Sequence, residues 1–188
     1  GSVKVAEGEL CLTSGNVIGT GAVTVDKDAR LSGVTGTTAL TNSSFTINGE
    51  LVVGAFANAT SGKINFGGKN VTISSTGKYV VGKGSYSNTT IENVNTLTIN
   101  GTIEVVLASS YTPKDGDVLT LWTANHFAGT PNYVLPKLPL GMAWDMSKIS
   151  EGKLTIVSDP TAIGVVPFGA KYGHNDIYDL KGQLVRKN

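Results

Sequence analysis

A triplet made of an apolar residue, a threonine and a second apolar residue recurs along this chain, each time followed by a turn and another alternating run. The three clearest copies begin at Phe45, Val71 and Leu97, and successive copies are 26 residues apart. Because successive side chains of a strand point to opposite faces, the two apolar members face one way and the threonine faces the other. The pattern predicts short strands with buried apolar pairs and an exposed threonine ladder.

Weaker copies extend the pattern, and a second inward set follows each turn. Further triplets begin at Val23, Leu119 and Leu154, and Leu10-Cys11-Leu12 is an earlier member with cysteine in the threonine position. The expected exposed ladder is Thr24, Thr46, Thr72, Thr98 and Thr120. The expected second inward set is Leu31, Leu51, Val53, Tyr79, Val81, Ile103 and Val105. A third, weaker segment carries Ile64, Phe66, Ile91 and Val94.

Two architectures produce such alternation, a meander of antiparallel hairpins and a solenoid. Asn48-Gly49 is the kind of dipeptide that closes a hairpin. In a meander, however, nothing requires the same residue types at the same phase in every repeat. In a solenoid each coil stacks on the previous one at about 4.8 Å, so equivalent positions touch and become alike. We therefore predict an all-β solenoid in which Ile47, Ile73 and Ile99 are stacked neighbours and Asn48-Gly49 is a corner.

The repeat weakens after residue 106, where a proline-rich and aromatic segment follows. We interpret this segment as an irregular C-terminal cap, because an open solenoid end would template edge pairing. From Ser158 the composition shifts to a linker that contains Gly and Pro, and a hairpin-like motif spans 176–186. The expected domains are a β-helix over 1–157, capped from about 106, and a linker with a short motif over 158–188.

Residues 8–157 resemble the autotransporter-associated β-strand repeats of bacterial surface proteins. The run Tyr-x-Pro-x-x-Gly-Asp-x-Leu-x-Leu at 111–121 and the pattern Leu-Pro-x-Gly-x-x-Trp from 138 carry this resemblance. It implies a single-stranded right-handed parallel β-helix that serves as an extracellular stalk. Residues 176–186 contain Tyr-Asp-Leu-x-Gly-x-x-Val and resemble the opening of the C-terminal sorting domain of secreted Bacteroidetes proteins. The later Gly-Ile-Tyr-Ile-Val strand of that family does not follow, so we expect a truncated copy.

Composition and charge exclude several classes of partner. The net charge of +1 comes from 15 basic and 14 acidic residues that form no blocks, so we expect no nucleic-acid partner. No apolar run approaches the ~20 residues that span a bilayer, so we expect no membrane insertion. The single cysteine excludes an internal disulfide. No leader sequence is visible, but Gly1-Ser2 is typical of a tag remnant, so secretion remains compatible with the sequence.

The sequence carries no catalytic or metal-binding signature, so we expect neither a cofactor nor an enzyme. Asp26-Lys27-Asp28 beside Arg30 has features of a calcium-dependent polysaccharide lyase, and we interpret it instead as a turn between strands. The two histidines are far apart in the sequence and lack partners at metal-ligand spacing. Glu50 and Glu104 would face outward about 10 Å apart, and we interpret them as solvated surface.

Aromatic side chains remain as candidates for ligand binding, because their faces can stack on sugar rings. The four candidates are Tyr86, Trp122, Tyr133 and Trp144. Three of them fall in the expected cap, which they would otherwise fill. We predict a monomeric, non-catalytic spacer module at the bacterial cell surface, joined to other domains of the same polypeptide. The alternative is a carbohydrate-binding module with polysaccharide as partner, and an enzyme of the lyase or hydrolase type ranks third.

Overall fold

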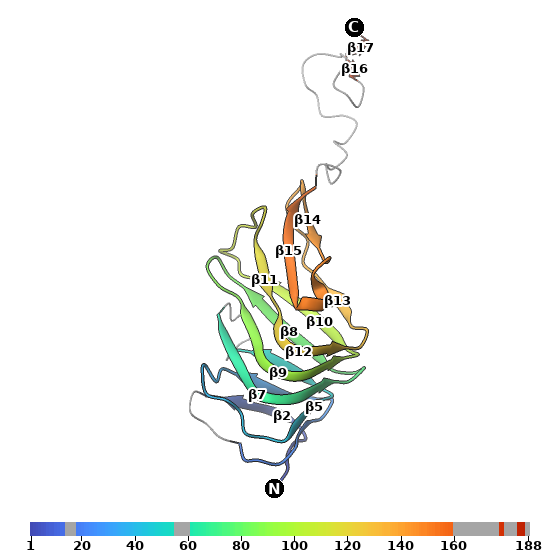
Figure 1. Ribbon diagram of the computed structural model, residues 1–188. Coiled ribbons are helices and arrows are strands. Elements are labelled where there is room, and N and C mark those ends of the chain that lie inside the picture. Colours follow the sequence, from blue (N-terminus) through green and yellow to red (C-terminus); the bar gives the residue numbers. More distant parts are fainter. Residues whose placement is uncertain (14–17, 55–60, 160–176, 179–183, 187–188) are drawn as a thin grey trace.

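The computed structural model describes residues 1–13, 18–54, 61–159, 177–178 and 184–186 (Figure 1). The described part of the chain is all-β and contains no α-helix. Its single helical turn is the 3-10 helix η1 (Ile149–Glu151). The all-β prediction is therefore confirmed.

Two six-stranded sheets, parallel throughout, form the body of the protein. In order, the first sheet contains β1 (Val3–Val5), β3 (Val23–Val25), β5 (Ser44–Ile47), β7 (Gly62–Ile73), β9 (Thr89–Ile99) and β12 (Trp122–Ala128). The second contains β2 (Gly8–Leu12), β4 (Ala29–Gly33), β6 (Glu50–Val53), β8 (Lys78–Lys83), β10 (Thr102–Leu107) and β13 (Asn132–Val134). From β1 to β10 the chain alternates strictly between the sheets, so each strand lies beside the strand two earlier (Figure 1).

Equivalent residues of successive repeats lie side by side. Ile47 pairs with Ile73, and Ile73 pairs with Ile99, which confirms the predicted stack. The partly exposed threonine column runs through Thr24, Thr46, Thr72 and Thr98, also as predicted. The corresponding column of the second sheet is Leu10, Leu31, Leu51, Tyr79, Ile103 and Tyr133.

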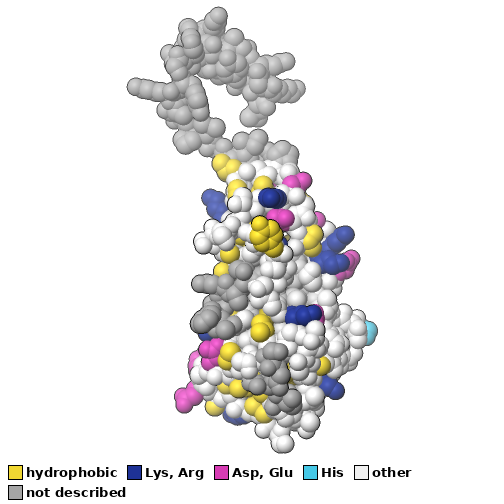
Figure 2. All heavy atoms as spheres, turned by 90° about the vertical axis from the view of Figure 1, so that its left-hand side faces the viewer, with side chains coloured by type: hydrophobic (Ala, Val, Ile, Leu, Met, Phe, Trp, Pro, Cys, Tyr) yellow, Lys and Arg dark blue, Asp and Glu magenta, His cyan; other side chains and the backbone are white. Residues whose placement is uncertain are grey.

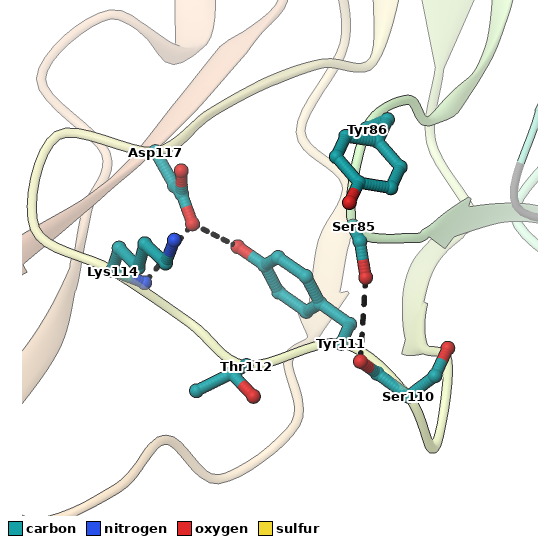
Figure 3. A pocket seen from close by; sticks show the side chains of 7 residues that line it. All are labelled: Ser85, Tyr86, Ser110, Tyr111, Thr112, Lys114 and Asp117. Carbon is teal, nitrogen blue, oxygen red and sulfur yellow. Dashed lines mark hydrogen bonds between the residues drawn. The ribbon is translucent and has the colours of Figure 1, made fainter.

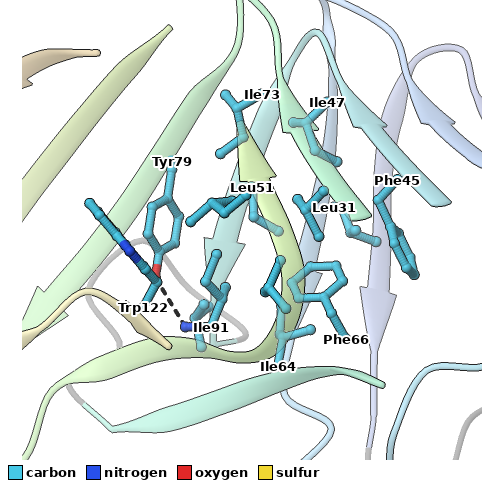
Figure 4. Packing of buried hydrophobic residues seen from close by; sticks show 14 of the residues in the cluster. Leu31, Phe45, Ile47, Leu51, Ile64, Phe66, Ile73, Tyr79, Ile91 and Trp122 are labelled. Carbon is cyan, nitrogen blue, oxygen red and sulfur yellow. Dashed lines mark hydrogen bonds between the residues drawn. The ribbon is translucent and has the colours of Figure 1, made fainter. Parts of the chain in front are cut away.

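The inward side chains of both sheets belong to one buried cluster (Figure 4). All members of the predicted second and third inward sets are buried. Phe45 and Phe66 pack edge to face, with ring centroids 4.7 Å apart. Complete burial of an aliphatic or aromatic side chain stabilises a fold by about 1.5–3 kcal/mol, so these repeated columns are the main source of stability.

Asn48-Gly49 is a corner between the sheets, as predicted, because β5 ends just before it and β6 begins in the other sheet just after it. Gly77 and Gly101 occupy the equivalent corners of the next two repeats. A Cβ atom on Gly101 would lie 2.0 Å from the carbonyl oxygen of Gly77, and one on Gly77 would lie 2.4 Å from that of Ile47. Only glycine allows the stacked corners to approach so closely.

The long strand β7 pairs with β9 on both sides of a bend. Its register with β9 shifts between Asn65 and Lys69. Gly67 and Gly68, which lie between them, have φ values of 62° and 71°, in the left-handed region that favours glycine. Ile64 and Phe66 precede the bend and are buried, which explains why the sequence shows a third inward segment in each repeat.

Beyond the parallel sheets, β11 (Val118–Thr120), β15 (Lys153–Ser158) and β14 (Met142–Asp145) form an antiparallel sheet. The prediction that the triplets at Leu119 and Leu154 continue the parallel column is wrong, because these two residues pair with each other in antiparallel register. The position beside Leu97 belongs instead to Phe127, and Ala128 rather than Thr120 lies beside Thr98. A strand with one buried face can show this triplet whether it pairs with a parallel or an antiparallel strand.

The predicted first member of the column is also wrong. Leu10-Cys11-Leu12 lies in the second sheet beside Leu31-Ser32-Gly33. The first sheet begins with Val3-Lys4-Val5, which pairs with Val23-Thr24-Val25. Lysine takes the threonine position because that position faces outward. Cys11 is exposed, in agreement with its predicted orientation.

Parallel pairing continues past residue 106, where we placed the start of the cap, because β12 and β13 still pair with β9 and β10. The antiparallel sheet follows, and the Leu121 amide donates to the Gly152 carbonyl oxygen at 2.7 Å. After residue 159 the structure describes only β16 (Ile177–Tyr178) and β17 (Leu184–Arg186), an antiparallel pair within the hairpin-like motif. The remainder of the expected linker lies outside the described residues.

Candidate functional site

Trp122 is not available to a ligand, although the sequence made it a candidate. Its side chain is only 1% exposed. The indole stacks on Phe127, with ring centroids 4.7 Å apart and planes 24° apart. Its register position beside Ile91 places it on the inward column of the first sheet. The predicted ligand role of Trp122 is therefore corrected to a role in the core (Figure 4).

Tyr133 and Trp144 are half-buried and pack against the core. Tyr133 continues the inward column beside Ile103, and burial raises the pKa of its hydroxyl above the usual value. Trp144 donates from Nε1 to the carbonyl oxygen of Pro136 at 2.9 Å. Both side chains pack within the C-terminal part of the described chain. This cap-filling role is the other interpretation of these residues that the sequence allowed.

Tyr86 is the candidate that the structure leaves fully exposed. It lines a hollow of about 420 Å³ between two loops, the turn after β8 and the loop that joins β10 to β11 (Figure 3). The lining residues of this hollow, which we call the Tyr86 hollow, are Ser85, Tyr86, Ser110, Tyr111, Thr112, Lys114 and Asp117. None of the other three candidate aromatics is among them.

Tyr111 forms a fixed wall of the Tyr86 hollow. Its side chain is 8% exposed, and its hydroxyl donates to Oδ2 of Asp117 at 2.6 Å. The Lys114 backbone amide donates to the same oxygen at 2.9 Å, and the Lys83 ammonium lies 5.3 Å from the ring centroid, within cation–π range. Burial, followed by the hydrogen bond to Asp117, raises the pKa of Tyr111 far above its usual value.

The two loops of the hollow are tied together, and several polar groups remain free to bind. Ser85 donates to the carbonyl oxygen of Ser110 at 3.3 Å. Within the described part of the chain, the Thr112 hydroxyl and the Lys114 ammonium have no hydrogen-bond or ion-pair partner. The sequence marked residues 111–121 only as part of a family resemblance, because a hollow between loops from successive repeats leaves no local signature.

The outward charged row of the second sheet is a chain of ion pairs. Arg30 donates from Nε and Nη2 to Oε2 of Glu50 at 2.9 and 2.7 Å. The Lys78 ammonium lies 2.6 Å from Oε1 of Glu50 and 3.2 Å from Oε2 of Glu104. Lys78 and then Arg30 lower the pKa of Glu50 below its usual value, against the opposing effect of burial. We had interpreted Glu50 and Glu104 as solvated surface. In the structure both carboxylates instead pair with Lys78.

These ion pairs bear on the two enzymatic alternatives. The general acid of a glycosidase requires a raised pKa, and the lowered pKa of Glu50 does not suit that role. A second hollow of about 420 Å³ is lined by Glu9, Lys27, Asp28, Arg30 and Glu50, among others. A lyase base at Arg30 would have to be free to reach the sugar, whereas Nε and Nη2 of Arg30 both donate to Oε2 of Glu50. Asp26, in the neighbouring turn, pairs with Lys4 at 3.1 Å.

Two further properties of the described residues concern metals and membranes. Nowhere in this part of the chain do three or more His, Cys, Asp or Glu residues gather in a way that could hold a metal ion. The same residues include no helix with the length and apolar character needed to cross a membrane. On the face shown in Figure 2, hydrophobic and charged side chains are scattered over a mostly uncharged polar surface.

Comparison with known proteins adds no relative from which a function could be transferred. No protein-family model, no curated protein and no solved structure matches the chain.

Proposed function

We propose that this chain is a non-catalytic spacer, a single-stranded right-handed parallel β-helix that separates other domains of a longer secreted or surface-anchored bacterial protein. The observation that carries the proposal is the in-register stacking of strands in two parallel sheets between which the chain alternates. Such stacking makes a structure that grows in one dimension, in which each repeat contacts mainly its neighbours. The resemblance to autotransporter-associated repeats and to a sorting domain supports the extracellular location.

The stack has the dimensions of a short rod. Each parallel sheet contains six strands, and their five intervals of about 4.8 Å give a length of about 24 Å. The backbone hydrogen bonds of the sheets run along this direction, so they resist extension together. Each additional repeat would lengthen the rod by one strand spacing without a change in its cross-section.

Outward side chains, in addition to the core, link the repeats. Asn95 donates to the amide oxygen of Asn70 at 3.0 Å, and Asn125 donates to that of Asn95 at 3.5 Å. The ion pairs of Arg30, Glu50 and Lys78 connect successive strands on the second sheet. A surface whose polar groups bind to one another along the stack direction suits a structural role, because few of them remain for chemistry.

The spacer proposal can be tested by adding one repeat. We would duplicate residues 71–96 in a Cys11→Ser background and attach nitroxide labels to cysteines that replace the exposed Lys27 and Thr130. The longer protein should remain folded. Double electron–electron resonance should show that the distance between the labels increases by about 4.8 Å. An unfolded protein, or an unchanged distance, would contradict the rod.

The non-catalytic part of the proposal needs a separate test. The purified protein would be incubated with pectin, alginate and neutral glucans, with and without Ca²⁺, and the products followed by mass spectrometry. We expect no product above the level of the Arg30→Ala variant. Release of unsaturated uronates that the Arg30→Ala variant abolishes would overturn the proposal in favour of a lyase.

A further inference from the structure

The Tyr86 hollow has features that a spacer does not require. Tyr86 is a large aromatic side chain, fully exposed on a short turn. Tyrosine and tryptophan are enriched at binding surfaces, where one side chain must supply apolar contact and a polar group together. Figure 3 shows the Tyr86 and Tyr111 rings on the same hollow, with polar side chains around them.

We propose that the Tyr86 hollow binds one neutral pyranose unit of a polysaccharide. A pyranose ring presents a face of C–H groups that stacks on an aromatic ring, and Tyr86 offers such a ring. Its edges carry hydroxyl groups that both donate and accept hydrogen bonds. The volume of about 420 Å³ lies within the range of small-ligand sites and accommodates one sugar ring with some water.

The polar groups of the hollow match a polyhydroxylated ligand. Ser85, Ser110 and Thr112 contribute hydroxyl groups, which can donate or accept. Oδ2 of Asp117 is used by Tyr111 and by the Lys114 amide, which leaves Oδ1 to accept from sugar hydroxyls. The Lys114 ammonium can donate to ring or hydroxyl oxygens. The hollow thus offers both donors and acceptors.

The balance of charge favours a neutral sugar over an anionic one. Lys114 and Asp117 both line the hollow and offset each other. Lys83 lies against the Tyr111 ring, is almost completely buried and is not among the lining residues. A uronate or phosphate would therefore meet one exposed cation and one carboxylate, and would gain little over a neutral ring.

The site is largely formed before any ligand binds. Asp117 and Lys83 fix the Tyr111 ring from two directions, and Ser85 ties the two loops together. A preformed site avoids the cost of ordering on binding. With a single freely exposed ring, we expect a dissociation constant on the order of 1 mM for one oligosaccharide. Such weak contacts become useful when many copies lie along a polymer.

The test is an NMR titration of the whole ¹⁵N-labelled chain with cellohexaose, mannohexaose, maltohexaose and, as the acidic probe, hexagalacturonate. We expect at least one neutral probe to shift the amide signals of 85–86 and 110–117. Tyr86→Ala should weaken this binding at least 10-fold without a change in the thermal midpoint, because the side chain packs on nothing. The matched control is Leu140→Ala, which removes a side chain that is 74% exposed and lies outside the hollow, and it should leave affinity unchanged within 2-fold.

Two outcomes would overturn this proposal. One is the absence of shifts in these segments with all three neutral probes, or binding that Tyr86→Ala leaves unchanged. The other is binding of hexagalacturonate alone, lost in Lys114→Gln, which would mark an anion site instead. Either result leaves the spacer proposal intact, because the rod length is measured independently of any ligand.

Discussion

Tyr79 connects three parts of the structure through one buried hydroxyl group. The side chain belongs to β8 and is fully buried. Its hydroxyl donates to the carbonyl oxygen of Leu121 at 2.6 Å and accepts from the Ile91 amide at 3.2 Å (Figure 4). Burial raises the pKa of Tyr79 far above its usual value, so the hydroxyl stays protonated and remains a donor. The substitution Tyr79→Phe removes only this oxygen and keeps the ring.

The structure sets the expected cost of Tyr79→Phe. Two hydrogen bonds are lost, each with a net contribution of about 1 kcal/mol, and the buried carbonyl group loses its best partner. The Ile91 amide already lies 3.5 Å from the Leu121 carbonyl oxygen, so a weak bond between them offsets part of the loss. We expect the free energy of unfolding to fall by about 1–2 kcal/mol, which lowers the thermal midpoint by about 3–6 °C for a chain of this size.

Urea denaturation followed by tryptophan fluorescence and circular dichroism measures this change. The matched control is Tyr133→Phe, which removes a half-buried hydroxyl for which the described residues offer no hydrogen-bond partner. It should change the free energy of unfolding by less than about 0.5 kcal/mol. If Tyr79→Phe costs no more than Tyr133→Phe, the buried Tyr79 hydroxyl does not contribute to stability through its two hydrogen bonds.

Two further substitutions test the corner glycines and the charged row. Gly101→Ala places a Cβ atom 2.0 Å from the Gly77 carbonyl oxygen, so urea denaturation should show a loss of more than about 2 kcal/mol; a loss below about 0.5 kcal/mol would contradict the close stacking. The folded pKa of Glu50 lies below its ordinary 4.5 because of Lys78 and Arg30, so its stabilisation is present above 4.5 and disappears as the pH falls through the folded value. The free energy of unfolding, measured by urea denaturation at about pH 5 and pH 3, should therefore fall less for Glu50→Gln than for the wild type, with a difference below about 1 kcal/mol in this partly exposed row; equal acid sensitivity would contradict it.

The sequence predicts the regular part of the fold because equivalent residues touch in the structure. Ile47, Ile73 and Ile99 are alike since each packs on the next, and contact between repeats keeps the pattern in phase. The same pattern does not show which strands pair with each other beyond the regular repeats. Leu119 and Leu154 satisfy it while pairing antiparallel, because an inward apolar residue contributes equally to either kind of sheet.

The candidate site is predicted less well than the fold. Tyr86 was a candidate because an aromatic face can stack on a sugar ring, and the structure leaves it exposed. Trp122 was chosen on the same ground and is buried, since its register beside Ile91 depends on a chain path that the sequence does not specify. Tyr111 and Asp117 share a hydrogen bond within one loop, and they were missed because the hollow that they line also needs Ser85 and Tyr86 of the preceding repeat.

Equivalent outward positions of successive repeats are neighbours in parallel register. Disulfide cross-linking in a Cys11→Ser background tests this arrangement. Thr46 pairs with Thr72, so cysteines at these positions have Cα atoms about 4.8 Å apart, within the range that a disulfide spans. Thr46 and Thr98 lie two strands apart, at about 9.6 Å, beyond that range. Under mild oxidation with peptide mapping by mass spectrometry, we predict that the 46/72 pair forms a disulfide and the 46/98 pair does not. A reduced 46/72 pair together with an oxidised 46/98 pair would contradict the stacked arrangement.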